Sequence, residues 1–310
     1  MEKEAKIFSG RGSQDLAKRI SDVYGIPLGN VLFTQFSDGE FEPSFEETVR
    51  GGRVFLVCST HQPNDNLMEL LLMIDAAKRA SAKHITAVMP YFGYARQDRK
   101  DKSRVPIGAK MIAQLLTAAG ATRVMTMDLH ADQIQGFFEI PVDHLFSSAI
   151  FVPHIKALGL DNLTIASPDM GGSKRAHNYA KMTNAEVVVC YKQRKAANEI
   201  EKMMVIGDVT DKHVILVDDM VDTAGTLATA ANMLKEQGAA SVRAYCTHGV
   251  LSGNAYDRID NSALEKLVIT DTIPKHHPSD KIEVLSVAEL FAHVMYNVHH
   301  HESISKHFLI

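Results

Sequence analysis

The chain has few or none of the features that mark membrane, secreted and zinc-binding proteins. Its 310 residues include only three cysteines, Cys58, Cys190 and Cys246, which are far apart and form no CxxC motif. No apolar run approaches the ~20 residues that a helix needs to cross a bilayer. The first five residues, MEKEA, do not resemble a signal peptide. We therefore expect a cytoplasmic protein with reduced, buried thiols and no membrane partner.

The chain also lacks a large excess of charge of one sign. Its 33 Lys and Arg and 37 Asp and Glu give a formal net charge of −4. Because nucleic-acid-binding surfaces are strongly basic, we expect no nucleic-acid partner. A GxxxxGK[ST] loop is missing, so ATP would not be held as it is in P-loop enzymes. Three adjacent histidines, 299–301, cannot all face one metal ion from a single helix, and we expect them on the surface.

Apolar, strand-like segments alternate with helix-like segments, which favours an α/β fold with largely parallel sheets. Two strand–helix–strand units match each other in order and spacing. Their predicted segments are 54–57, 66–80 and 85–89 in the first unit, and 214–217, 227–237 and 242–246 in the second. We infer a decayed internal duplication, which predicts two similar α/β domains in tandem.

The length of the chain also suggests about two domains. We expect the first domain at 1–147, with 296–310 packing back on it, and the second domain at 148–295. In the first unit, Cys58-Ser59-Thr60 stands where the second unit has Asp218-Asp219. A sugar-phosphate site is therefore expected in the second domain only.

The most specific stretch is 214–226, VILVDDMVDTAGT. Its apolar residues predict a buried strand of a parallel sheet that ends at two adjacent aspartates. The small residues that follow open a helix, and a helix N-terminus offers free N–H groups to a phosphate. Carboxylates beside it can accept hydrogen bonds from sugar hydroxyls or hold Mg2+. The simpler interpretation is an ordinary βα turn with capping acids.

Other polar residues follow other predicted strands, at the edge where open α/β sheets bind ligands. The basic segment 90–104, PYFGYARQDRKDKSR, suits a polyphosphate, although a solvated charge run is the alternative. His130 is a candidate metal or phosphate contact, although such a histidine is usually satisfied in the core. The acidic loop 36–40, FSDGE, is weak alone and reads equally well as a β-turn. Asp169 precedes two glycines.

These segments occur in the order FSDGE, NDNLMELL, PYFGYARQDRK, DLHADQIQGFF, SPDMGG, KQR, VDDMVDTAGT, THGVLSG and ESIS. Together they closely resemble the ribose-phosphate pyrophosphokinase family over nearly the whole chain. The resemblance implies two tandem phosphoribosyltransferase-like domains, each with a mainly parallel sheet flanked by helices. It also implies transfer of the pyrophosphoryl group of ATP to the 1-hydroxyl of ribose 5-phosphate, which supplies phosphoribosyl pyrophosphate for nucleotide biosynthesis.

The resemblance assigns roles residue by residue. Lys192 and Arg194 match the catalytic pair on a flexible loop, and His130 and Asp169 match the positions that hold the Mg2+ cofactor. The positions that match the ATP site are Phe36, Asp38, Gly39, Glu40, Arg96 and Gln97. The positions that match the ribose 5-phosphate site are Arg194, Asp218, Asp219, Asp222, Thr223, Ala224, Gly225 and Thr226. Of these, the first two aspartates would face the ribose hydroxyls.

The family also implies a homo-oligomer, a hexamer, that is activated by phosphate and inhibited by ADP. Arg50, Ser303 and Ser305 match positions of that allosteric site. One departure concerns the catalytic loop, which usually reads Lys-Arg-Arg-Pro but here reads KQRK at 192–195. The two key cations are kept, while the proline that stiffens the loop is missing, so the departure concerns loop dynamics and not the reaction.

Two alternatives stay open at this point. A nucleobase phosphoribosyltransferase shares the DDMVDTAGT motif, but such an enzyme usually has one domain and does not explain Arg96 and Gln97. A regulatory homologue without catalytic activity would bind an active synthetase. The presence of Lys192 and Arg194, together with His130 and Asp169, argues against that second alternative.

Overall fold

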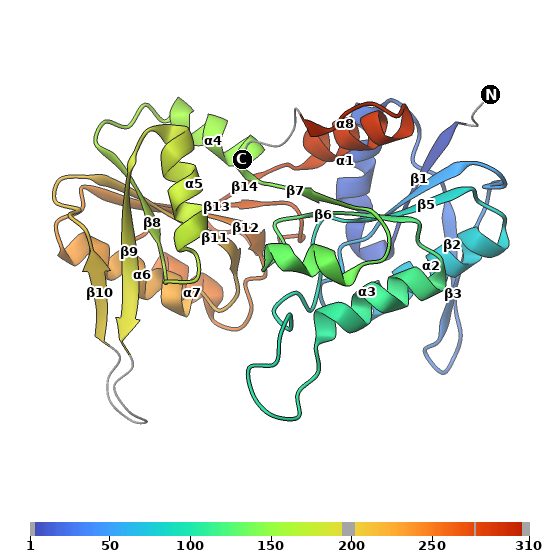
Figure 1. Cartoon of the computed structure of the whole chain (residues 1–310), viewed down its shortest axis with the longest axis horizontal. Helices are drawn as coiled ribbons and strands as arrows, with labels where there is room; N and C mark the ends of the chain where they lie inside the picture. Colours follow the sequence, from blue (N-terminus) through green and yellow to red (C-terminus); the bar gives the residue numbers. More distant parts are fainter. Residues whose placement is uncertain (1–3, 194–201, 276, 306–310) are drawn as a thin grey trace. The chain divides into compact units, whose positions relative to one another are not determined.

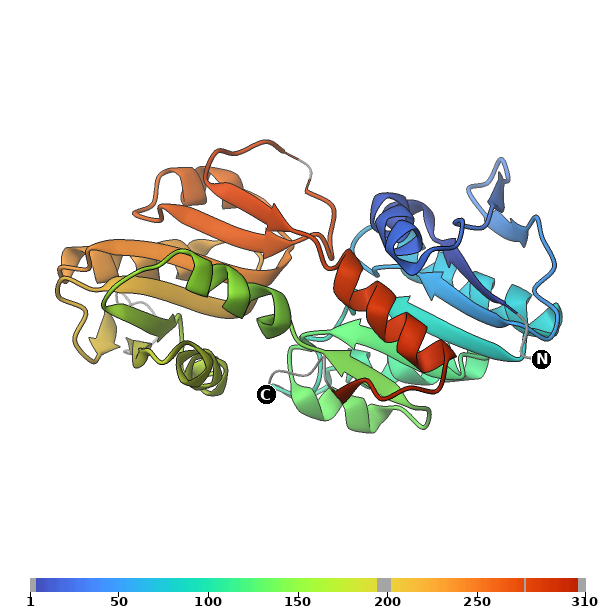
Figure 2. The same cartoon turned by 90° about the horizontal axis from the view of Figure 1, so that it is seen from above.

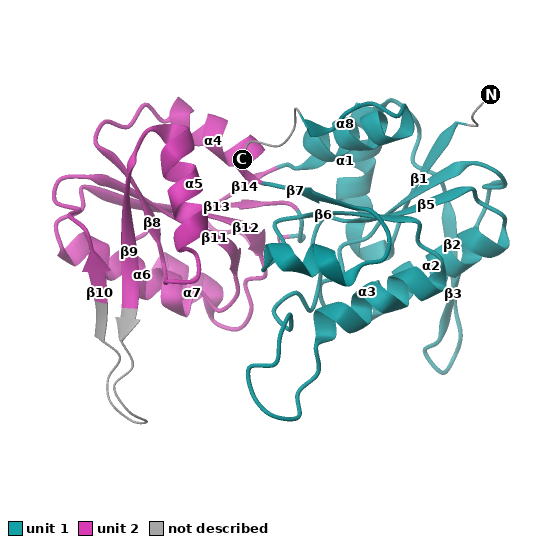
Figure 3. Cartoon of the chain, in the orientation of Figure 1, with its two compact units in different colours: residues 1–146, 272–274, 286–308 teal, residues 147–271, 275–285, 309–310 magenta. Residues whose placement is uncertain are grey.

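The computed structural model describes residues 4–193, 202–275 and 277–305, and Figure 1 shows its helices and strands. The chain forms two compact units, coloured separately in Figure 3. Unit 1 comprises Met1–Phe146, Thr272–Pro274 and Ser286–Phe308, and unit 2 comprises Ser147–Asp271, Lys275–Leu285 and Leu309–Ile310. No helix in the described ranges combines the length and the apolar character needed to cross a bilayer.

Unit 1 contains a five-stranded sheet, in the order β1-β4-β5-β6-β7, with every neighbouring pair parallel. Its strands are β1 (Ala5–Ser9), β4 (Arg53–Val57), β5 (His84–Met89), β6 (Arg123–Met127) and β7 (Val142–Leu145). The helices α2 (Asp65–Arg79) and α3 (Gly108–Ala119) bury their apolar sides in one core with alternate strand residues. The helix α1 (Gln14–Tyr24) packs against β1 and α8 (Ala288–His299). Two short 3-10 helices, η1 (Arg11–Ser13) and η2 (Asp132–Phe137), precede α1 and follow β6.

Unit 2 contains a seven-stranded sheet, in the order β10-β9-β8-β11-β12-β13-β14. Its strands are β8 (Leu163–Ser167), β9 (Glu186–Gln193), β10 (Lys202–Ile206), β11 (His213–Val221), β12 (Ser241–Gly249), β13 (Lys266–Thr270) and β14 (Ile282–Leu285). Only β9 and β10 pair in antiparallel fashion. One side of the sheet is covered by α6 (Gly225–Glu236) and α7 (Ala255–Asp260), and the other by α4 (Ser148–Ala157) and α5 (Ser173–Thr183). The predicted α/β fold with mainly parallel sheets is confirmed.

The two sheets share one topology, as an internal duplication requires. The order β1-β4-β5-β6-β7 corresponds strand by strand to β8-β11-β12-β13-β14. Each unit also has an antiparallel strand pair at the same point in the chain. In unit 1, β2 (Val31–Gln35) and β3 (Phe41–Phe45) lie between α1 and β4. In unit 2, β9 and β10 lie between α5 and β11. In unit 1, however, β2 and β3 form a separate two-stranded sheet.

Each sheet is followed in the chain by a helix that packs in the other unit. The helix α4 follows β7 of unit 1 but packs against α5, and α8 follows β14 of unit 2 but packs against α1 (Figure 2). The contacts thus assign all of Ser286–Phe308 to unit 1, whereas the sequence placed residues up to 295 in the second domain. One expectation was wrong: His299 is half-buried, because the Tyr24 hydroxyl lies 2.7 Å from its Nδ1.

The packing of α8 yields a stability prediction. Phe291 belongs to α8, and its side chain is completely buried. The substitution Phe291→Ala would leave a cavity, so it should lower the free energy of unfolding by about 3–5 kcal/mol. Urea denaturation followed by circular dichroism measures the change. The matched control is Glu289→Gln on the exposed side of the same helix, for which we expect a change below about 0.5 kcal/mol. Equal losses in the two variants would show that α8 does not stabilise unit 1 through its buried side.

Candidate functional site

The loop between β11 and α6 is short and begins later than expected. The sequence placed the end of the strand at Val217, but β11 continues to Val221 because β12 pairs with it as far as Gly249. Asp218 and Asp219 therefore lie within the strand, which corrects the prediction that the strand ends before them. The loop itself is Asp222-Thr223-Ala224, and α6 begins at Gly225.

The backbone of this loop is held by the neighbouring segments of unit 2. Ser252 Oγ donates to the Asp222 carboxylate, and the Ser252 amide donates to the Asp222 carbonyl oxygen at 3.0 Å. The guanidinium of Arg258 donates to the Thr223 carbonyl at 2.8 Å. Ala224, the residue before α6, has a left-handed backbone with φ 57°. The first-turn amides of Gly225 and Thr226 have no carbonyl partner within the helix, which leaves them suited to an anion.

The two adjacent aspartates of β11 share one cation. Arg175 Nη1 on α5 lies 3.2 Å from Asp218 Oδ1 and 2.9 Å from Asp219 Oδ1. The Asp219 amide also donates to Asp218 Oδ1 at 2.9 Å. Burial, followed by the neighbouring Asp219 charge, raises the pKa of Asp218 well above its ordinary value, while Arg175 acts in the opposite direction. The pair therefore holds a proton more readily than exposed aspartates do.

Arg175 was not singled out in the sequence, although a signal for it existed. It belongs to the first turn of the helix that follows SPDMGG, and β8 is the parallel neighbour of β11. The carboxyl ends of neighbouring parallel strands meet at one edge of a sheet, so a cation just beyond β8 lies within reach of acids at the end of β11. Ser252 lies in the quoted segment THGVLSG, but no role was assigned to it, and Arg258 gave no comparable signal.

Asp169 lies at the same edge, two residues beyond the end of β8. Its Oδ1 accepts a hydrogen bond from the Gly172 amide at 3.0 Å, so the carboxylate caps the start of α5. Gly172 is required here for space, because a Cβ atom at this position would lie 2.7 Å from Ser167 Oγ. The predicted metal ligand Asp169 is thus exposed but fixed in position.

His130, the other predicted metal ligand, lies in unit 1 beyond the end of β6 and is exposed. The neighbouring backbone is fixed, because the Leu129 amide donates to His144 Nε2 at 2.9 Å. Within the described part of the chain, no three His, Cys, Asp or Glu side chains form a cluster that could hold a metal ion. His130 and Asp169 belong to different units.

The residues expected to bind ATP lie at two places in unit 1. Phe36, Asp38, Gly39 and Glu40 form the exposed tip of the β2–β3 hairpin, where the Phe36 amide donates to the Glu40 carbonyl at 2.8 Å. A glycine suits the tip, because Gly39 has φ 99°. The other place is the segment that links β5 to α3 and contains Arg96 and Gln97.

The segment between β5 and α3 is buried at Tyr91, Phe92 and Ala95, while its basic residues from Arg96 onwards are exposed. The Gln97 carbonyl accepts a hydrogen bond from the Ala109 amide at 3.2 Å, at the start of α3. Gly93 allows the chain to approach the end of β4 closely, since a Cβ atom there would lie 2.2 Å from the Thr60 carbonyl oxygen. The exposed cations of this segment are Arg96, Arg99, Lys100, Lys102 and Arg104.

The predicted catalytic pair is only partly within the described residues. The backbone of Lys192 belongs to β9 and pairs with Met203 of β10. Arg194 lies outside the described residues.

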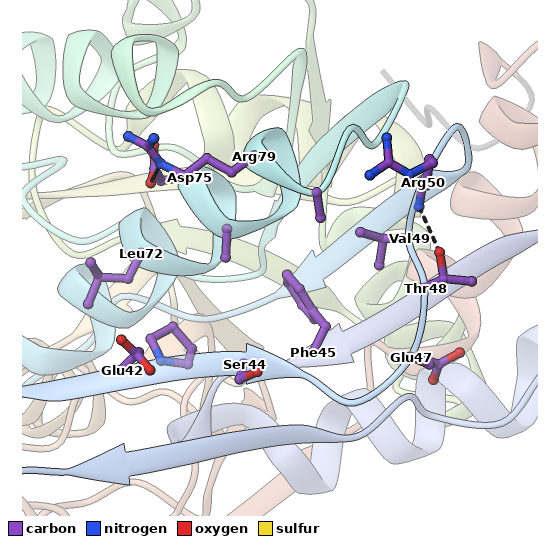
Figure 4. Close-up of a pocket in the computed structure, with 13 residues that line it drawn as sticks. Glu42, Ser44, Phe45, Glu47, Thr48, Val49, Arg50, Leu72, Asp75 and Arg79 are labelled. Carbon is purple, nitrogen blue, oxygen red and sulfur yellow. Dashed lines mark hydrogen bonds and ion pairs between the residues drawn. The ribbon is translucent and has the colours of Figure 1, made fainter.

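Arg50 of the predicted allosteric set lines a cavity of about 550 Å³ between β3 and α2 (Figure 4). Its amide donates to Thr48 Oγ1 at 3.4 Å, and its Nη1 donates to Ser81 Oγ at 3.1 Å. Ser303 and Ser305 belong to the same unit, and their hydroxyls lie 2.7 Å apart. They are not among the described residues that line this cavity.

Comparison with known proteins identifies the family of the chain. Residues 5–120 match the N-terminal domain of ribose phosphate pyrophosphokinase, and residues 166–309 match the phosphoribosyl synthetase-associated domain. The chain is 57% identical to a ribose-phosphate pyrophosphokinase of Porphyromonas gingivalis, over 98% of this chain and 97% of the relative. It is 53% identical to a ribose-phosphate pyrophosphokinase of Campylobacter jejuni, over 98% and 99% of the two chains.

A solved structure gives the same result. The crystal structure of phosphoribosylpyrophosphate synthetase from Mycobacterium smegmatis superimposes with a TM-score of 0.91 at 37% identity, covering 96% of this chain and all of that one. Both halves of the sequence and the fold of the whole chain therefore lead to one conclusion: the chain belongs to the ribose-phosphate pyrophosphokinase family.

Proposed function

We propose that this enzyme transfers the β,γ-pyrophosphoryl group of ATP to the 1-hydroxyl of ribose 5-phosphate, producing AMP and 5-phospho-α-D-ribose 1-diphosphate. It is thus a ribose-phosphate diphosphokinase, a transferase of nucleotide biosynthesis whose substrates follow from its family. The observation that carries the proposal is the paired aspartates of β11 followed directly by the N-terminus of α6. This arrangement suits both ends of a sugar phosphate.

Ribose 5-phosphate is proposed to bind along this strand and loop. Asp218 and Asp219 accept hydrogen bonds from the ribose hydroxyls. The phosphate binds the amides at the start of α6 and the hydroxyls of Thr223 and Thr226. The contacts of Asp222 support a role in shaping the loop, because its carboxylate already accepts from Ser252. The remaining proposed contacts are Ala224 and Gly225, through their backbone, and Arg194.

ATP is proposed to bind with its phosphates near Arg96 and Gln97 and its base against the tip of the β2–β3 hairpin, which in the family comes from a neighbouring subunit. The base contacts Phe36, which is half exposed, and the acids Asp38 and Glu40 on either side of Gly39. Lys192 and Arg194 stabilise the negative charge that develops as the pyrophosphoryl group is transferred. These cations act mainly in the transition state and not in the ground state.

Mg2+ is the proposed cofactor, with His130 and Asp169 as its contacts. The residues fit a divalent cation, since the chemistry of the donor set is that of carboxylate and imidazole groups. The carboxylates of Asp218 and Asp219 lie on β11, the parallel neighbour of the strand that precedes Asp169, which supports a cation at this edge of the unit 2 sheet. When bound, Mg2+ neutralises the charge on the transferred group.

We also propose a cytoplasmic homo-oligomer, a hexamer, with phosphate and ADP as effectors and Arg50, Ser303 and Ser305 as allosteric contacts. The cavity beside Arg50 supports an effector site in unit 1. Three free, buried cysteines are compatible with a reducing compartment. The proposed domains are 1–147 with 296–310, and 148–295. The shared strand order of the two sheets supports two phosphoribosyltransferase-like domains.

Incubation with ATP and ribose 5-phosphate alone tests the activity. We expect AMP to form in equimolar amount with phosphoribosyl pyrophosphate, and removal of divalent cations with EDTA to stop the reaction. A nucleobase phosphoribosyltransferase or a regulatory homologue without activity would form no AMP under these conditions. Chromatographic separation of AMP from ATP and ADP provides the measurement.

The first mutational prediction concerns Lys192→Ala. Because Lys192 is proposed to act in the transition state, the substitution should lower kcat by about 100-fold or more and change KM little. Steady-state AMP formation measures both constants. The matched control is Lys212→Ala at the opposite end of β11, where the lysine pairs with Glu186, and its kcat should stay normal. A normal kcat in Lys192→Ala would contradict the proposed catalytic pair.

A second prediction follows from the raised pKa of Asp218. An ionised carboxylate accepts hydroxyl hydrogen bonds more strongly than a protonated one, so KM for ribose 5-phosphate should rise as the pH falls, beginning well above the ordinary carboxyl pKa of 3.8. The phosphate group of ribose 5-phosphate also titrates near pH 6. Asp218→Asn is therefore the control, because the substrate still titrates in this variant while residue 218 does not. The variant should have a higher KM that depends less on pH. Identical pH profiles for both proteins would exclude Asp218 as the titrating group.

A further inference from the structure

We infer that Arg11 is a positioning residue for ATP binding. Its side chain holds the β2–β3 hairpin at the angle that the adenine contacts require. This inference rests on the proposed ATP site at the hairpin tip. It extends that proposal to a side chain that does not itself belong to the tip. Arg11 lies in η1, directly after β1.

The hairpin needs an anchor because it is not part of the main sheet. Strands β2 and β3 pair only with each other, and a two-stranded hairpin needs packing against other elements to be stable in water. Here β3 packs against α2. The end that is distant from the tip is packed, since the rings of Phe45 and Phe8 lie 4.5 Å apart. Towards the tip, the inner side presents Phe33 and Phe41, which are half-buried.

The Arg11 guanidinium lies against both of these rings. Its Cζ is 5.2 Å from the centroid of Phe33 and 4.9 Å from the centroid of Phe41. A cation at such a distance from an aromatic ring is attracted by the ring's quadrupole. One side chain therefore contacts both strands of the hairpin. Phe41 is also the residue immediately after Glu40, so this contact restrains the strand directly next to the tip.

Arg11 is in turn fixed by a carboxylate of α2. Its Nε donates to Glu69, and its backbone amide donates to Glu69 Oε2 at 2.8 Å. The Glu69 side chain is only 2% exposed, whereas the Arg11 side chain is 38% exposed. A buried carboxylate requires a partner, and this pair therefore sets the position of the guanidinium. Gly10 leaves room for it, because a Cβ atom there would lie 3.2 Å from Glu69 Oε2.

These contacts form one chain of restraint within unit 1. Glu69 fixes Arg11, Arg11 fixes Phe33 and Phe41, and these rings fix the strands that carry the tip. A hairpin that is already ordered binds its ligand without losing further conformational entropy. Loss of the restraint should weaken ATP binding, while the ribose 5-phosphate site on β11 of unit 2 keeps its own contacts.

The test compares Phe41→Leu with Phe41→Tyr in the full-length protein. Both variants keep Arg11 and Glu69 paired, but only tyrosine keeps an aromatic face for the guanidinium. We expect Phe41→Leu to raise KM for ATP by about 5- to 30-fold, as the loss of one partly buried cation–π contact implies. KM for ribose 5-phosphate should stay unchanged, and Phe41→Tyr should keep both constants of the unmodified enzyme.

Arg11→Ala and Arg11→Lys extend the test to the arginine itself. The alanine variant should raise KM for ATP at least as much as Phe41→Leu, and the lysine variant should restore part of the loss because it keeps the charge but not the planar group. Lys18→Ala on α1 is the control, since it removes an exposed cation paired with Asp22 in the same unit. Hydrogen exchange in peptides covering 31–45 should be faster in Arg11→Ala and in Phe41→Leu, but not in Lys18→Ala.

Two results would overturn the inference. One is an unchanged KM for ATP in Phe41→Leu, and the other is an equal rise of both KM values, which would indicate general loss of structure. Failure of the proposed function is recognised separately, because the unmodified enzyme would then form no AMP. If Arg11→Ala does not fold, the two Phe41 variants still decide the question.

Discussion

The parallel pairing of the strands is the constraint on which the proposed sites depend. In a parallel sheet every strand ends at the same edge, so residues far apart in the chain come together there. In unit 2 this edge joins Asp218 and Asp219 of β11 to Arg175 beyond β8, with hydrogen-bond distances of 2.9 and 3.2 Å. The arrangement concentrates charge where the next helix begins, and the N–H groups of that helix can bind a phosphate.

Much of the fold could be predicted because hydrophobic pattern and strand order are local or periodic properties. The strands β4, β5 and β12 and the helices α2 and α6 lie within a few residues of the predicted segments. The end of β11 could not be placed in the same way. Its polar residues 218 and 219 resemble a loop, but pairing with β12 extends the strand, and tertiary pairing overrides local preference. Which strands pair is decided by contacts that no short window contains.

The candidate sites also differ in how far apart in the chain their residues are. Asp218, Asp219 and the start of α6 could be found from one continuous motif, because strand, loop and helix follow each other directly. Arg175 required a second step, from the parallel pairing of β8 with β11 to the edge that their ends share. Arg11 could not be found, since it contacts residues more than twenty positions away and no motif of the sequence marks it. The burial of His299 could not be predicted either, because its contact with Tyr24 joins residues 275 positions apart.

The two units share one topology but differ in the side chain at the end of an equivalent strand. Cys58 in unit 1 occupies the position of Asp218 in unit 2. The first paired residues of β4 and β11 are Arg53 and His213, and Cys58 and Asp218 each come five residues later. Burial, together with the nearby Glu69 carboxylate, raises the pKa of the Cys58 thiol, so the strand end in unit 1 is neutral.

One of the buried carboxylates of unit 1 lies instead on α2, where Glu69 is paired with Arg11. In unit 2 the equivalent charge is at the strand end, where a ligand can reach it. In the roles proposed above, the same scaffold uses a carboxylate as a ligand contact in unit 2 and as an anchor for a neighbouring hairpin in unit 1. The two copies therefore differ physically in which element carries a buried carboxylate, since Asp219 lies on β11 in unit 2 and Glu69 lies on α2 in unit 1.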